Sequence, residues 1–143
     1  MSLIVVDASV AAKWCLPRAG ETLVEEAFGL LRRYSSGEIR IIVPDVFWPE
    51  MLNVLWKAVR LGRLSKPEAE ASLEGLRAHQ LTTVSSFPLL DSAFAIACTF
   101  GRTAYDSLYV ALAVDSKGQL VTADERLANA LAAQLPVRWL GAP

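Results

Sequence analysis

A short apolar run that ends at a carboxylate constrains the fold of this chain more than any other feature. Leu3-Ile4-Val5-Val6 shows no alternation of apolar and polar residues, and Asp7 follows it directly. A continuous apolar run of this length predicts a strand buried on both faces. Such strands are typical of parallel sheets with helices on both sides. The run therefore predicts an α/β fold with a charged group at the end of a buried strand.

Strand and helix patterns alternate along the rest of the chain. Further strands are predicted at Ile39–Val43, Leu81–Ser85, Gln119–Thr122 and Val137–Leu140. Helices are predicted at Ala8–Cys15, Glu21–Tyr34, Pro49–Leu61, Ser65–His79, Pro88–Phe100, Thr103–Gly118 and Asp124–Gln134. This alternation with short links predicts a three-layer α/β/α sandwich with a mainly parallel sheet. No linker or repeat interrupts it, so residues 1–143 are expected to form one domain.

Composition narrows the class of protein further. Hydrophobic residues make up 53% of the chain and charged residues 20%, which is typical of a globular domain. The net charge of −1 gives no strong overall attraction to nucleic acid, so any such contact is expected to be local. No apolar stretch is long enough to span a membrane, and the N-terminal segment lacks a basic region, so the expected location is the cytoplasm.

The polar inventory excludes several kinds of chemistry. The chain has one histidine, His79, which is expected to interact with a helix end. It has no nucleophile elbow, no Walker A motif and no GxGxxG motif, so the parts for triad hydrolysis, nucleotide hydrolysis and dinucleotide redox chemistry are missing. Cys15 and Cys98 lack metal-ligand spacing and are expected to be buried free thiols.

Four carboxylates stand at the edges of apolar elements, where an unpaired charge is costly to bury. They are Asp7, Glu50, Asp106 and Asp124. Asp7 and Asp124 follow predicted strands, and ligand sites form beyond the carboxyl ends of parallel strands. Four such acids close together require a neutralising cation, and oxygen ligands suit magnesium (Mg2+) or manganese (Mn2+). The implied substrate is a phosphate ester.

Helix capping explains each of these acids equally well when it is taken singly. Asp106 completes a Thr103-x-x-Asp106 capping pattern, and Glu50 after Pro49 suits the first turn of a helix. Asp7 stands just before the helix predicted to begin at Ala8 and could cap it. In Thr122-x-x-Glu125, Thr122 is the candidate cap of the last helix, and Asp124 favours the positive end of that helix. Spacing and composition therefore leave both interpretations open.

Four segments, taken in order, resemble the motifs of PIN-domain ribonucleases. They are Asp7-Ala8-Ser9-Val10-Ala11-Ala12-Lys13-Trp14, Pro49-Glu50-x-x-Asn53-Val54-Leu55, Thr103-Ala104-Tyr105-Asp106-Ser107-Leu108-Tyr109 and Leu120-Val121-Thr122-Ala123-Asp124-Glu125-Arg126-Leu127. The resemblance runs from about residue 3 to about residue 140, and is greatest to the VapC-type toxins of toxin–antitoxin pairs.

The resemblance implies a PIN-like domain that cleaves RNA as a magnesium- or manganese-dependent endoribonuclease. It also implies a homodimer and a small cognate antitoxin protein as partner, which is expected to lay a segment near the first helices. The catalytic and metal-binding acids of the family fall on the four carboxylates named above. Ser9 and Thr122 match positions where the family often has small hydroxyl residues near the metal.

Basic side chains near the rim of the site are candidates for contact with RNA. They are Lys13, Arg18, Lys57, Arg60, Arg102 and Arg126. Two alternatives to a ribonuclease remain. One is a catalytically weak PIN-like module that binds RNA or protein. The other is a phosphatase-like hydrolase, which would need a second Asp where this chain has Ser9.

Overall fold

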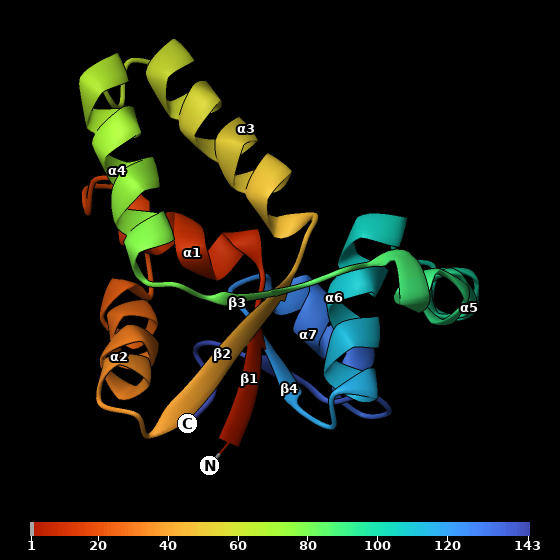
Figure 1. The fold of residues 1–143 in the computed structure, drawn as a ribbon. Helices are drawn as coiled ribbons and strands as arrows, with labels where there is room; N and C mark the ends of the chain where they lie inside the picture. The colour runs from red at the N-terminus through yellow and green to blue at the C-terminus, as the bar shows by residue number, and fades with distance from the viewer. Residues whose placement is uncertain (1) are drawn as a thin grey trace.

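The computed structural model describes residues 2–143 and contains one five-stranded sheet (Figure 1). The strands are β1 (Ser2–Val6), β2 (Ile39–Pro44), β3 (Thr82–Val84), β4 (Gln119–Thr122) and β5 (Val137–Trp139). Their order across the sheet is β3-β2-β1-β4-β5, and all neighbouring pairs are parallel. The predicted α/β fold is confirmed, and β1 lies at the centre of the sheet.

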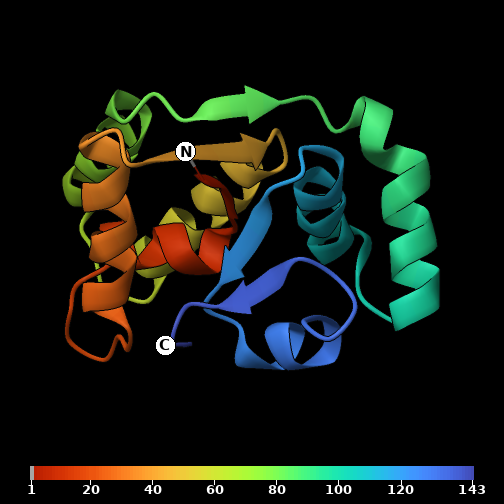
Figure 2. The same ribbon diagram turned by 90° about the horizontal axis from the view of Figure 1, so that it is seen from below.

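Helices cover both faces of the sheet (Figure 2). They are α1 (Ala8–Cys15), α2 (Val24–Ser35), α3 (Phe47–Arg60), α4 (Lys66–Ala78), α5 (Leu90–Phe100), α6 (Ala104–Asp115) and α7 (Glu125–Leu131), with a short 3-10 helix, η1 (Phe87–Leu89). α1 and α2 lie on one face, and α6 packs on the other with α5 outside it. α3 and α4 pack together against α1 and extend beyond the carboxyl ends of the strands (Figure 1).

The central strands position the site by their register. Val5 and Val6 are fully buried, as a strand covered on both faces requires. Val6 pairs with Val121 of β4, so the residues that follow, Asp7 and Thr122, stand next to each other where the two strands end. The register of β1 and β4 therefore brings Asp7 and Thr122, which are 115 positions apart in the sequence, to the same edge of the sheet.

Several predicted helix boundaries were wrong. α2 begins at Val24 rather than Glu21, because Glu21 is held outside the helix by ion pairs and Leu23 before the helix has a positive φ of 56°. α3 begins two residues before Pro49, which is tolerated there because the first helical N–H groups need no partner within the helix.

Three smaller corrections concern the second half of the chain. Pro88 belongs to η1, and α5 begins only at Leu90. α7 ends at Leu131 rather than Gln134. Cys98 is exposed rather than buried, because it lies on the outer helix α5, whereas Cys15 is half-buried. None of the helices in residues 2–143 has the length and apolar character needed to cross a membrane.

Candidate active site

Asp7 and Asp124 lie at the carboxyl edge of the sheet, and both also cap helices. Asp7 follows β1, and its Oδ1 accepts hydrogen bonds from the backbone N–H groups of Ser9 (3.1 Å) and Val10 (3.4 Å). Asp124 lies two residues after β4, and its Oδ1 accepts from the N–H of Leu127 at 3.2 Å. The capping interpretation is therefore confirmed for Asp7, whereas Asp124 itself, rather than the predicted Thr122, caps α7. Both caps hold the carboxylates at the edge where ligand sites form.

The hydroxyl groups of Ser9 and Thr122 connect Asp7 to the backbone of the segment that carries Asp124. The hydroxyl of Thr122 donates to Oδ2 of Asp7 at 2.6 Å and accepts from the N–H of Asp124 at 3.1 Å. The hydroxyl of Ser9 donates to the other carboxylate oxygen of Asp7 and accepts from the N–H of Ala123 at 2.9 Å. Both Asp7 oxygens are thus fixed in place by hydroxyl donors.

Glu50 and Asp106 approach this pair from helices on opposite sides. Glu50 is in the first turn of α3, and Asp106 is in the first turn of α6 after the N-cap residue Thr103. Oε1 of Glu50 accepts a hydrogen bond of 2.5 Å from the hydroxyl of Tyr109, one turn further along α6 from Asp106. The negative charge of Asp106 acts on both Asp7 and Glu50, so the structure brings all four predicted acids into one cluster.

Asp7, Glu50 and Asp106 hold their protons more tightly than ordinary carboxyl groups. Burial raises the pKa of Asp7 from 3.8 to about 6, and hydrogen bonds from Ser9 and Thr122 only partly oppose this. Burial also raises the pKa of Glu50 and of Asp106. The charge of Arg102 opposes the rise at Asp106, and the charge of Asp124 adds to it. Burial is therefore the main cause of the raised pKa values at this site.

The donor set is compatible with a hard divalent cation. All candidate ligands are carboxylate or hydroxyl oxygens, which Mg²⁺ and Mn²⁺ prefer. Within residues 2–143, no three His, Cys, Asp or Glu side chains are arranged as direct ligands of one ion. Magnesium usually binds through one or two carboxylates and keeps several waters, so the cluster fits an ion held partly through water.

A cleft of about 350 Å³ adjoins the cluster. Its lining residues are Ala8, Val46, Pro49, Glu50, Asn53, Val54 and Tyr105. Glu50 is the acid of the cluster that lines the cleft, together with the exposed ring of Tyr105. The arrangement offers room for an extended substrate next to the carboxylates.

The sequence places Tyr109 in the third family motif, but no functional role was predicted for it. The signal that identifies it is its spacing from Asp106, since residues three apart on a helix lie on the same face. Its ring is buried, and burial together with the Glu50 carboxylate raises the pKa of its hydroxyl far above the ordinary value of 10. Tyr109 is therefore a fixed hydrogen-bond donor to Glu50.

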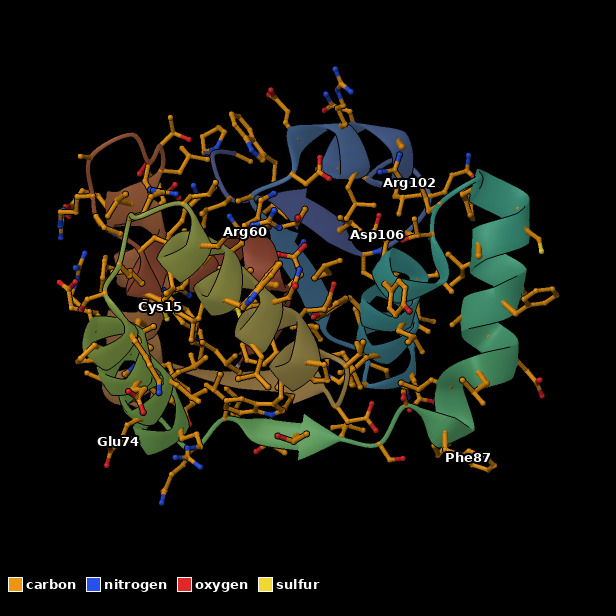
Figure 3. All side chains as sticks on the ribbon, turned by 90° about the horizontal axis from the view of Figure 1, so that it is seen from above. Cys15, Arg60, Glu74, Phe87, Arg102 and Asp106 are labelled. Atoms are coloured by element: carbon orange, nitrogen blue, oxygen red, sulfur yellow. The ribbon has the colours of Figure 1, made fainter. Side chains whose placement is uncertain are left out.

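The six predicted basic residues have different environments. Lys13 is buried and pairs with Glu21 at 3.5 Å, so it is not a cation at the rim, contrary to the prediction. Arg18 pairs with Glu25, and Arg60 stacks on the ring of Trp56. Of the remaining three, Lys57 and Arg126 are exposed, and Arg102 lies beside Asp106 (Figure 3).

Comparison with known proteins gives consistent matches. The model of the PIN domain family matches residues 4–131. Ribonuclease VapC3 of Pyrobaculum aerophilum is 36% identical over 128 residues, which cover 88% of this chain and 92% of that protein.

Two solved structures share the fold. That of PAE2754 from Pyrobaculum aerophilum has a TM-score of 0.71 at 23% identity, over 97% of this chain and 91% of that one. A toxin–antitoxin complex from Klebsiella pneumoniae has a TM-score of 0.63 at 12% identity, over the full length of both chains.

Proposed function

The chain belongs to the PIN domain family, and we propose that it is an endoribonuclease that hydrolyses RNA phosphodiester bonds with Mg²⁺ or Mn²⁺. The observation that carries the proposal is the meeting of four carboxylates from separate elements at the carboxyl edge of the sheet, beside an open cleft. The similarity to a ribonuclease over nearly the whole chain supports it.

In this proposal Asp7, Asp106 and Asp124 hold the cation, directly or through water. When bound, a divalent cation lowers the pKa of water and stabilises charge that develops on a phosphate. Ser9 and Thr122 hold the Asp7 carboxylate in one orientation.

Glu50 orients the attacking water or helps to hold a second cation, and Tyr109 keeps its carboxylate in position. The oxygen of water forms a bond to phosphorus, and the bond from phosphorus to the 3′ oxygen breaks. The water proton passes to solvent or to a carboxylate of the cluster, and the leaving 3′ oxygen takes up a proton from solvent. The products are a 5′-phosphate and a 3′-hydroxyl.

The first experiment is cleavage of total cellular RNA by the purified chain. It compares magnesium, manganese and EDTA, maps new 5′ ends, and includes Asp7→Asn, which keeps the shape of the side chain and removes its charge. We expect discrete cuts that need the metal and fall about 100-fold in the variant, because it loses a ligand of the cation that would stabilise the developing charge. Absence of cleavage in either metal by the folded protein, with RNA still bound, would instead favour a binding module.

We further propose that the chain is the toxin of a toxin–antitoxin pair and acts in the cytoplasm. An apolar groove between α3 and α4 supports a protein partner, because its walls carry exposed Leu52 and Trp56 together with Leu73. Induced expression should arrest growth of a bacterial host, and Asp7→Asn should abolish the arrest. The product of a small neighbouring reading frame should co-purify with the chain and inhibit cleavage.

A homodimer is the remaining part of the proposal. Exposed apolar side chains gather along η1 and α5, where Phe87 and Phe94 are 79% and 71% exposed. Leu90 and Phe94 also border a cavity of about 410 Å³ between α5 and α6. An exposed apolar patch of this kind is typical of a protein interface.

A further inference from the structure

Arg102 is the one cation that pairs with the acid cluster in the described part of the chain. It lies in the link between α5 and α6, directly after Gly101, which adopts a positive φ of 67°. Its Nη2 is 3.7 Å from Oδ2 of Asp106, and both residues are labelled side by side in Figure 3. Among the ion pairs of residues 2–143, no other includes any of the four acids.

The guanidinium of Arg102 has more donors than the protein uses. An arginine side chain presents five N–H groups. The contact to Asp106 is longer than a normal hydrogen bond, and Nε is buried without any acceptor. A buried donor without a partner is rare and calls for a missing acceptor.

The neighbouring acids do not supply that acceptor. The Asp7 carboxylate accepts from Ser9 and Thr122, and Glu50 accepts from Tyr109. Nε itself has no access to solvent, but the Arg102 side chain is 24% exposed and its two terminal nitrogens make no hydrogen bond within the described residues. These terminal nitrogens are therefore the donors that can meet an anion from outside the protein, and their planar arrangement matches the oxygens of a phosphate through two parallel hydrogen bonds.

We propose that Arg102 binds the non-bridging oxygens of the phosphate that is cleaved. This inference rests on the proposed function, because that function places an RNA phosphate beside the four acids. Attack by water adds negative charge to these oxygens, so a guanidinium aimed at them binds the transition state more tightly than the ground state. Arg102 then acts on the substrate, and its pair with Asp106 orients it.

The test compares Arg102→Gln and Arg102→Lys with a matched control, Arg33→Gln. Arg33 is also paired with a carboxylate, that of Glu38, but lies on α2, away from the acid cluster. Steady-state cleavage of an RNA oligonucleotide that spans a mapped site gives kcat and KM. Fluorescence anisotropy with Ca²⁺ in place of Mg²⁺, on RNA shown to remain intact, gives binding at several salt concentrations.

We expect Arg102→Gln to lower kcat about 100-fold, a loss typical of removing one charge-stabilising donor. Arg102→Lys should recover part of kcat, because it keeps the charge but not the planar fork. The slope of log affinity against log salt should fall by about 0.7 in Arg102→Gln, as expected for one lost phosphate contact with a single strand. Arg33→Gln should match the wild type in all three quantities.

A merely structural role predicts a different result. If Arg102 only held the link before α6, both Arg102 variants would lower the melting temperature, while the salt slope and the kcat of the folded fraction stayed at the wild-type values. That outcome overturns the inference and leaves the proposed function standing. A wild-type chain that neither binds nor cleaves RNA overturns the proposed function itself.

Discussion

Asp7 is buried in an environment that disfavours the charged form of its side chain. Its pKa of about 6 lies above the ordinary 3.8, so the folded state holds the proton more tightly than the unfolded chain. Its contribution to the free energy of unfolding is therefore complete below the unfolded pKa and is lost as the pH rises through about 6. In the metal-free protein this loss amounts to about 3 kcal/mol by pH 8, from roughly 1.4 kcal/mol for each pKa unit.

Asp7→Asn should remove this pH-dependent loss. Relative to the wild type in EDTA, its free energy of unfolding should rise by about 3 kcal/mol between pH 4 and pH 8. Urea denaturation at several pH values measures this difference, and a constant offset from altered hydrogen bonds does not affect its slope. Asp45→Asn is the control, because the Ser86 hydroxyl holds the pKa of Asp45 below its usual value and confines its effect to pH below about 4. A flat difference for Asp7→Asn would contradict the buried, destabilised carboxylate.

Tyr109 controls the protonation of Glu50. Burial raises the pKa of Glu50, and the hydrogen bond from Tyr109 opposes that rise. Tyr109→Phe should therefore raise the pKa of Glu50 further, so that cleavage loses activity at a higher pH than in the wild type. The acid limb of the rate profile measures this shift. Tyr34→Phe, which removes a hydroxyl bonded only to backbone carbonyls, should leave the limb in place.

At the scale of secondary structure, an acid between a strand and the next helix can both cap that helix and take part in the proposed chemistry. Asp124 caps α7 through the N–H of Leu127 and also belongs to the acid cluster. Asp124→Asn keeps a side-chain oxygen for the cap, whereas Asp124→Ala removes it. Both should lose cleavage activity, but only the alanine variant should lose about 1 kcal/mol of stability. Equal stability of the two variants would show that the cap is not the stabilising contact.

Replacement of two glycines by alanine should change the stability of the protein in opposite directions. A Cβ at Gly118, between α6 and β4, would lie 2.7 Å from the backbone oxygen of Leu3. Gly118→Ala should therefore destabilise the protein by about 1–3 kcal/mol, because the central strand must shift. A Cβ at Gly75 in α4 meets nothing within 4 Å, so Gly75→Ala should stabilise the helix by about 0.5–1 kcal/mol. Thermal unfolding of the two variants measures both effects.

For the whole molecule, we expect a homodimer that forms through the apolar patch on η1 and α5. Phe94→Glu places a charge in the middle of this patch and should convert a dimer into a monomer. Sedimentation velocity measures the change. Leu61→Glu, at an exposed leucine just after α3, is the matched control and should remain a dimer. A monomeric wild-type chain would contradict the proposed homodimer.

Local pattern predicted much of this architecture correctly. Apolar runs such as Leu3–Val6 predicted the parallel strands, and the motifs around Asp7 and Asp106 predicted the family, which the comparisons confirm. Predicted helix boundaries were wrong where a tertiary contact competed with helical periodicity. Glu21 is an example, because ion pairs hold it outside α2.

The sequence by itself predicted the alternation of strands and helices, and its motifs predicted the family, because both depend on residues that lie close together along the chain. The catalytic role of the four acids, which rests on the resemblance of those motifs, stays a prediction. Only the tertiary structure decided which groups share an environment. The Tyr109–Glu50 hydrogen bond spans 59 positions, Lys13 is buried against Glu21, and Arg102 has a buried donor without a partner. Periodicity specifies which face of an element is buried, but the distance between two side chains on different elements depends on strand register and helix packing.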